Sequence, residues 1–147
     1  MSIHAEADLI LKLYDLRREA TMRTARDWFF LEFKPQSMED VNATMFGAHS
    51  GHFRMVVTYW EMAAALVNHG AIGLELFTDT NGEHIGVFGK IEPFLPQMRA
   101  AYNPKFCASL EKLIDNTPGG REQLAAMRER MKAIQAELSQ RQAAAAS

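Results

Sequence analysis

The chain has only one cysteine, Cys107, and no long apolar run. One cysteine cannot form an internal disulfide, which excludes a disulfide-stapled scaffold and is typical of a protein from a reducing compartment. No apolar run approaches the roughly 18 residues that a membrane-spanning helix needs. The first residues, MSIHAEADLILKLYD, have no basic segment before the apolar one, so they do not predict a secretory signal. We therefore expect a cytoplasmic protein without a transmembrane segment.

Positive charge is also not in excess. The 147 residues include 16 Lys and Arg against 18 Asp and Glu, a net charge of −2, which gives no electrostatic basis for binding nucleic acid. Hydrophobic residues make up 48% of the chain, enough to build a core in one domain of this length. We expect a single helical domain over residues 1–147, with a core over 1–118 and a C-terminal helix and frayed tail over 119–147.

Two long helices are predicted in the first half. Residues 3–33 contain no Gly or Pro and carry apolar stripes at helical spacing. A helix of that length would span about 45 Å, longer than a domain of this size, so it bends or projects towards a partner subunit. The second helix is expected over residues 38–68, with Ser37 and Asp40 as a capping box and His69-Gly70 as its stop. Gly47 and Gly51 mark a break or a close contact within it.

The middle of the chain allows two interpretations. LELFTDTNGEHIGVFG has the Asn-Gly turn of a β-hairpin, but two short strands alone are marginal, so we favour a helix from about Gly82 to Ile91. Pro93 and Pro96 kink or restart that helix. Asn103-Pro104 opens a further helix, KFCASLEKLIDN.

The last helix, predicted over residues 119–142, has a heptad pattern of apolar residues: Leu124, Met127, Met131, Ile134 and Leu138. This pattern predicts either packing antiparallel to the first helix, which we favour, or the seam of a dimer. The fold class is therefore all-α. We expect an irregular bundle of about five helices, with a long N-terminal helix and a heptad-patterned C-terminal one.

The strongest candidate for a metal-binding or catalytic stretch is GAHSGHFRMVVTYWE, residues 47–61. His49 and His52 are three residues apart and share a helix face, but a zinc site needs three or four ligands. Glu61 lies nine residues beyond His52, close to the opposite side of the helix. The chain has neither the Glu-x-x-His of di-iron bundles nor His-Glu-x-x-His. We therefore expect a packed helix face and predict no metal, no cofactor and no catalytic residue.

Glu61 is the one carboxylate inside the apolar run YWEMAAALV, so it is expected to be partly buried and paired with Arg54 or Arg99. The candidate ligand-binding residues are accordingly Glu61, His49, His52 and Arg99. Glu83-His84 is interpreted as the first turn of a helix, with the acid favoured by the helix dipole. Glycines 82, 86 and 89 match neither a dinucleotide fingerprint nor a P-loop.

Two further stretches, YWEMAAALVNHGAIGLELF and FLPQMRAAYNPKFCASLEKL, carry a resemblance. They resemble an uncharacterised family of bacterial all-helical proteins, domain of unknown function 4760, over roughly residues 38–115. The positions that match are Tyr59, Trp60, Glu61, Asn68, Gly70, Ile72, Arg99, Pro104, Phe106 and Leu110. The chain departs from the pattern at Gly73, where an acid is common. The resemblance implies an all-α bacterial protein, soluble or adjacent to a membrane, and no activity.

Two hypotheses about function follow. The first is a small homodimeric helical protein that acts through a helical interaction surface, in a regulatory or structural role and with an unknown protein partner. The alternative is a ligand- or metal-binding helical bundle, with or without enzymatic activity, in which His49, His52, Glu61 and His84 converge on one pocket.

Overall fold

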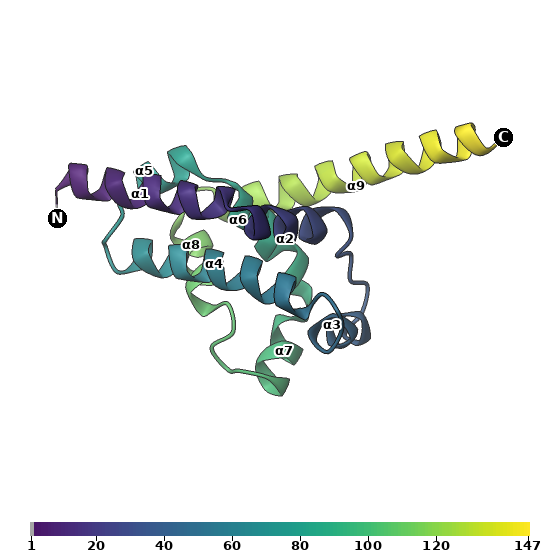
Figure 1. Ribbon diagram of the computed structural model, residues 1–147, viewed down its shortest axis with the longest axis horizontal. Coiled ribbons are helices and arrows are strands. Elements are labelled where there is room, and N and C mark those ends of the chain that lie inside the picture. Colours follow the sequence, from purple (N-terminus) through teal and green to yellow (C-terminus); the bar gives the residue numbers. More distant parts are fainter. Residues whose placement is uncertain (1) are drawn as a thin grey trace.

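The computed structural model describes residues 2–147 as an all-α protein (Figure 1). Within this range the chain forms nine α-helices, one 3₁₀ helix and no strand. The helices are α1 (Ile3–Arg18), α2 (Ala20–Leu31), α3 (Met38–Met45), α4 (Ser50–Asn68), α5 (Leu74–Thr80), α6 (Glu83–Ile91), η1 (Glu92–Phe94), α7 (Leu95–Ala101), α8 (Ala108–Asn116) and α9 (Gly120–Ala146). The all-α prediction is confirmed and the hairpin alternative is wrong. The predicted number of about five helices is too low, because both long helices are broken and Leu74–Thr80 forms a further helix, α5.

The first long helix bends at Glu19. This residue leaves the helical conformation, with φ −58° and ψ 143°, and separates α1 from α2. Its side chain accepts a hydrogen bond from the backbone N–H of Met22 at 3.0 Å, so it caps the new helix. Hydrogen bonds from the backbone N–H groups of Thr21 and Met22 lower the pKa of the Glu19 carboxyl. Of the two alternatives for the helix expected over residues 3–33, the bend is the one found, at a residue where neither Gly nor Pro signals a break, and the second part ends at Leu31.

The second long helix is interrupted near Gly47. A Cβ at that position would lie 2.5 Å from the carbonyl oxygen of Ala43, so the turn between α3 and α4 needs glycine. The predicted start is confirmed, because the Ser37 hydroxyl accepts from the N–H of Asp40 at 3.2 Å. The predicted stop is also confirmed, since α4 ends at Asn68 and Gly70 has a φ of 84°.

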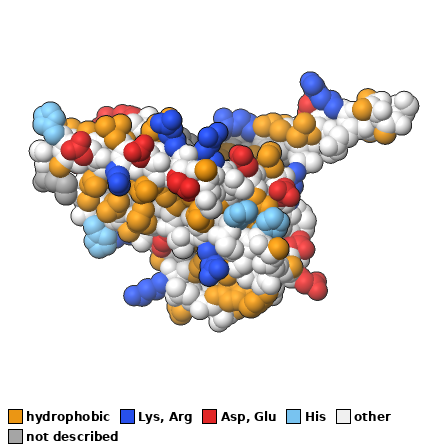
Figure 2. Space-filling model, viewed as in Figure 1, with side chains coloured by type: hydrophobic (Ala, Val, Ile, Leu, Met, Phe, Trp, Pro, Cys, Tyr) orange, Lys and Arg blue, Asp and Glu red, His pale blue; other side chains and the backbone are white. Residues whose placement is uncertain are grey.

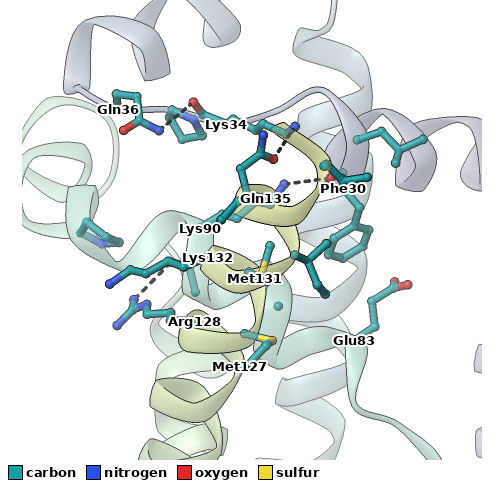
Figure 3. A pocket seen from close by; sticks show the side chains of 18 of the residues that line it. Phe30, Lys34, Gln36, Glu83, Lys90, Met127, Arg128, Met131, Lys132 and Gln135 are labelled. Carbon is teal, nitrogen blue, oxygen red and sulfur yellow. Dashed lines mark hydrogen bonds between the residues drawn. The ribbon is translucent and has the colours of Figure 1, made fainter. Parts of the chain in front are cut away.

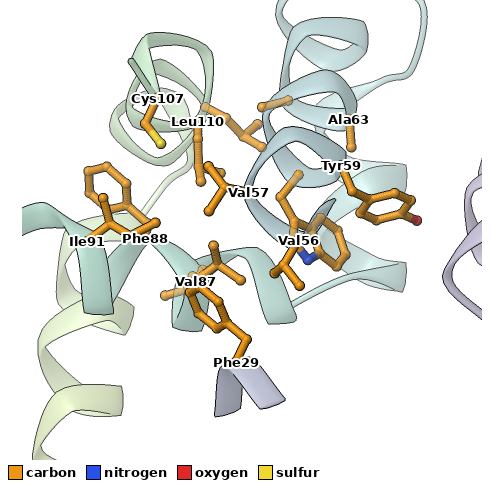
Figure 4. Packing of buried hydrophobic residues seen from close by; sticks show 14 of the residues in the cluster. Phe29, Val56, Val57, Tyr59, Ala63, Val87, Phe88, Ile91, Cys107 and Leu110 are labelled. Carbon is orange, nitrogen blue, oxygen red and sulfur yellow. The ribbon is translucent and has the colours of Figure 1, made fainter. Parts of the chain in front are cut away.

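The core is organised around α4, which packs mainly against α8 and α2. Figure 4 shows Val56 and Val57 of α4 facing Val87 of α6, with Phe29 of α2 and Leu110 of α8 closing the cluster. The largest fully buried side chains are Trp60, Phe29, Phe53, Phe77 and Phe88. Full burial of such a side chain contributes roughly 1.5–3 kcal/mol, so this cluster supplies much of the stability of the fold.

Two glycines of α6 allow its neighbours to approach closely. A Cβ on Gly86 would lie 3.2 Å from Cε1 of Phe30, and one on Gly89 would lie 3.1 Å from Cδ1 of Leu124. These distances are tight for a methyl group, so a larger residue would require the side chains of Phe30 or Leu124 to shift. Gly86 and Gly89, from the glycine spacing that matches no nucleotide-binding motif, therefore lie in close helix packing.

The start of α8 differs from the prediction. The helix expected from Asn103-Pro104 begins only at Ala108, and residues 104–107 form turns. Cys107 precedes α8 with a positive φ of 56°, a conformation that costs a non-glycine residue about 1–2 kcal/mol. Its thiol is buried, and burial raises the pKa of Cys107 to about 12. Cys107 is therefore part of the buried core.

The last helix, α9, projects beyond the rest of the molecule and carries the C-terminus at its tip (Figure 1). Its first turns pack on α6 and α8, with Leu124 buried. Its main packing partner is therefore not the first helix, contrary to the arrangement that we favoured. The tail expected to fray is helical as far as Ala146.

Candidate functional site

An open, apolar groove lies between α2, α6 and α9, with a volume of about 960 Å³ (Figure 3). Its floor is formed by Phe30 of α2, the two close-packing glycines of α6, and Met127 of α9. The groove exists because α9 leaves the body at an angle and does not lie flat on α2. Its other lining residues include Leu31, Lys34, Pro35, Glu83, Lys90, Phe94, Arg128, Met131, Lys132, Ile134, Gln135 and Leu138.

One wall of the groove is the heptad pattern of α9. We call Met127, Met131, Ile134 and Leu138 the α9 stripe. Ile134 is 59% exposed and Leu138 is 47% exposed, while Leu31 on the α2 side is 70% exposed. Hydrophobic side chains also lie at the surface of the projecting arm in Figure 2. Exposed apolar residues that gather in a groove mark a site of interaction more often than scattered ones do.

Lys90 holds the α2 side of the groove in place. Its Nζ donates hydrogen bonds to the carbonyl oxygens of Phe29 and Phe33, both at 2.7 Å, and to that of Phe30 at 3.3 Å. The carbonyls at the C-terminal end of a helix lack partners within the helix, and a cation there also opposes the helix dipole. Burial, together with the charge of Lys34, lowers the pKa of Lys90 to about 8.

The rim of the groove is mainly basic, with Lys34, Lys90, Arg128 and Lys132 against Glu83. Some of these side chains bridge the walls. Nζ of Lys34 donates to the Gln135 side chain at 3.2 Å, and Arg128 donates to the carboxylate of Glu92 at 2.7 Å. The rim therefore joins α9 to the rest of the molecule as well as surrounding the apolar floor.

A polar network lies beside the groove at Glu83. The guanidinium of Arg26 reaches both carboxylate oxygens of Glu83 at 2.7–3.1 Å, and Nε1 of Trp60 donates to the same carboxylate at 3.1 Å. The network joins α2, α4 and α6, and the hydrogen bonds to Glu83, together with its charge, raise the pKa of Arg26. The sequence predicts only that Glu83 is a first-turn acid, because its partner Arg26 lies 57 residues away along the chain.

His84 faces the core beside this network. It is 2% exposed, its ring lies 5.1 Å from that of Phe77 and 5.8 Å from that of Trp60, and burial lowers its pKa to about 4. Within residues 2–147, Nδ1 of His84 has no hydrogen-bond partner. The residue is therefore a neutral core histidine, separate from the other candidate residues.

His49 and His52 come together against α2. The His49 ring is stacked on Trp28, with centroids 5.0 Å apart, and the His52 ring lies 5.6 Å from that of His49. Both rings thus extend the aromatic packing at the junction of α2 and α4. The shared helix face that the spacing predicts is found only in part, because His49 lies in the turn before α4 and is exposed, while His52 is half-buried in the first turn of the helix.

Glu61, further along α4, has a different role. Its carboxylate accepts hydrogen bonds from the backbone N–H groups of Ser109 at 3.0 Å and Leu110 at 2.8 Å. These are first-turn N–H groups of α8 that have no partner within the helix, so Glu61 acts as a cap supplied by another helix. The cap favours a negative charge because it lies at the positive end of the helix dipole.

The expected ion pair of Glu61 is absent from the part of the chain that the structure describes. Arg99 instead donates to the carbonyl oxygen of Phe106 at 2.9 Å and pairs with Glu111 at 3.1 Å. Nε of Arg54 donates a hydrogen bond to the carbonyl oxygen of Ser50 at 3.4 Å. Glu61 and Arg99 therefore support the same α8 region without contacting each other as an ion pair.

These candidate residues form two groups. Nine residues of helix separate His52 from Glu61, which is about 13 Å along the axis of α4. Among residues 2–147, no group of three or more His, Cys, Asp or Glu side chains is arranged to hold a metal ion. The structure thus places His49 and His52 against Trp28, and Glu61 and Arg99 beside α8.

Comparisons with known proteins give one match. The model of a family described as "Domain of unknown function (DUF4760)" matches residues 2–117, a longer stretch than the resemblance indicated. No curated protein and no solved structure matches the chain significantly. In the described part of the chain, none of the helices combines the length and hydropathy needed to cross a membrane.

Proposed function

This chain belongs to the DUF4760 family, a domain of unknown function, and we propose that it is a homodimeric interaction module that works through the α9 stripe and its groove. Its role in a bacterial cytoplasm would be regulatory or structural. The observation that carries the proposal is an apolar heptad face, half exposed, on a helix that projects from a packed body.

The division between body and arm supports this proposal. The family match ends at residue 117, just before α9 begins at Gly120. Of the residues in the buried hydrophobic core, only Leu124 comes from α9. Most apolar residues of α9 therefore contribute little to the core, and their burial against a partner would add roughly 25 cal/mol per Å².

The polar residues of the body support the same interpretation. Glu61, Lys90 and Glu83 are each bound to backbone or side-chain groups of neighbouring helices. They hold the helices in place, which is what a scaffold for an interaction surface requires. A surface made for recognition by packing needs apolar area and a charged rim, and the groove has both.

The test is the mass of the full chain in solution. We expect dimers in sedimentation equilibrium at about 100 µM and dissociation of the Ile134→Glu variant, since a charge in the seam would be buried without a partner. Ala133→Glu is the matched control, because it adds the same charge one residue away on an exposed face outside the stripe. A monomeric wild-type chain at this concentration would refute the proposal.

The ligand-binding hypothesis for His49, His52, Glu61 and Arg99 stays a prediction of the sequence. Calorimetric titration with Zn²⁺ would test its metal-binding form. Tight binding that is lost in His49→Ala would favour it over the interaction module.

A further inference from the structure

We infer that the groove takes the α9 helix of a second copy in antiparallel orientation, with Arg130 of each chain beside Glu137 of the other. This inference rests on the proposed self-association and adds the partner segment, its direction and its register. It is carried by the charges that flank the α9 stripe and by the position of the stripe in the groove.

The first step concerns heptad positions. Met131 and Leu138 take one core position of the repeat, and Met127 and Ile134 take the other. Arg130 and Glu137 directly precede Met131 and Leu138, so both occupy the flanking position that borders the seam on one side. These two flanking residues carry opposite charges.

The second step is the direction of pairing. In an antiparallel pair the same flanking position of both helices meets across the seam, so Arg130 faces Glu137 of the second copy, and the reverse contact repeats by symmetry. In a parallel pair Arg130 would face Gln135, and Glu137 would face Gln142. Two ion pairs form in the antiparallel arrangement and none in the parallel one.

The third step is the register. When Arg130 lies beside Glu137 of the second copy, Met131 packs on Ile134 and Met127 packs on Leu138, each pairing occurring twice. All four residues of the α9 stripe then have a partner. Leu124 needs none, because it is 2% exposed against its own body.

The fourth step is the fit to the fold. The stripe forms a wall of the groove, so a helix lying along it also enters the groove and covers Leu31 on the opposite side. The distal half of α9 extends away from the body (Figure 1), which leaves room for a second helix beside it. Antiparallel pairing then places the two bodies at opposite ends of the helix pair.

Charge reversal tests the pairing. We expect Arg130→Glu and Glu137→Arg each to raise the dimer dissociation constant about tenfold, because each creates two like-charged contacts per dimer. The double variant, Arg130→Glu with Glu137→Arg, should recover the wild-type constant. Glu129→Arg is the control, since Glu129 is exposed outside the seam and pairs with Lys132 along the helix much as Glu137 pairs with Arg141.

Cross-linking tests the direction independently. Mixed Arg130→Cys and Glu137→Cys chains should cross-link through a short thiol reagent, and mixed Arg130→Cys and Gln135→Cys chains should not. The wild-type chain is a suitable blank because Cys107 is 2% exposed. Cross-linking of the second mixture alone would show a parallel dimer and overturn this inference, while the proposed self-association would stand. A chain that stays monomeric would overturn both.

Discussion

The body and the arm use similar apolar residues in different ways. In the body, residues 2–117, the apolar face of α4 is covered on both sides by α2 and α8, and Trp60 is 0% exposed. On α9 the equivalent face is covered at Leu124 and partly at Met127, and Ile134 is 59% exposed. Helical periodicity is thus the same signal in both regions, and the presence of a partner helix decides whether the face becomes core or docking surface.

The largest expected effect is a loss of stability of the body. Trp60→Ala should lower the free energy of unfolding by about 3–5 kcal/mol, because it opens a cavity in the core. It also removes the Nε1 hydrogen bond to Glu83. Urea denaturation followed by circular dichroism measures this change. Phe46→Ala, at an 82% exposed position, is the control and should change stability by no more than about 0.5 kcal/mol.

A smaller expected effect is a loss of stability at low pH. The pKa of His84 is about 4 in the folded protein, against 6.5 for the ordinary side chain. Between these pH values the unfolded state binds a proton that the folded state does not, so stability falls as pH drops from about 6.5 to about 4, by about 3 kcal/mol in all.

Urea denaturation across that pH range measures the effect, and His84→Leu should flatten the slope. Phe77→Leu is the control, since it alters the packing against the His84 ring without removing a titratable group, and should leave the slope unchanged. An unchanged slope in His84→Leu would show that other groups cause the acid dependence.

The smallest expected effect tests whether Glu61 supports the fold as a helix cap. Glu61→Ala should destabilise the body by about 1–2 kcal/mol, the usual cost of removing a helix cap. Glu61→Gln should cost less, because the amide keeps one acceptor oxygen. Both are measured by chemical denaturation, with Asp79→Ala, at an exposed position on α5, as the control. A Glu61→Ala variant as stable as the wild type would exclude the capping role.

Several features of the fold could be predicted because their causes are local. Ser37 and Gly70 mark the start of α3 and the end of α4, and Gly47 accounts for the break between α3 and α4. A bend was one of two alternatives for the over-long first helix, but its position at Glu19 could not be predicted, since glutamate is a good helix former and its capping hydrogen bond exists only once the helix has turned. The contact between α9 and α6 depends on glycines whose packing role appears only when the neighbouring helices are in place.

The candidate site was predictable to a smaller extent. The sequence singled out Glu61 as a carboxylate in an apolar run, but its partners, the N–H groups of Ser109 and Leu110, lie 48 and 49 residues away. The groove was missed, although its α9 wall was recognised as a heptad pattern. Contacts between distant residues leave no periodic signal in one chain, and so they could not be inferred.

The sequence by itself determined the helical class and the heptad face of α9, because helix propensity, capping and apolar spacing act over a few residues. Only the tertiary structure decided which apolar faces are covered, which carboxylate caps which helix, and where the groove lies. These depend on how helices pack, and packing is settled by the shapes of side chains that are far apart in the chain.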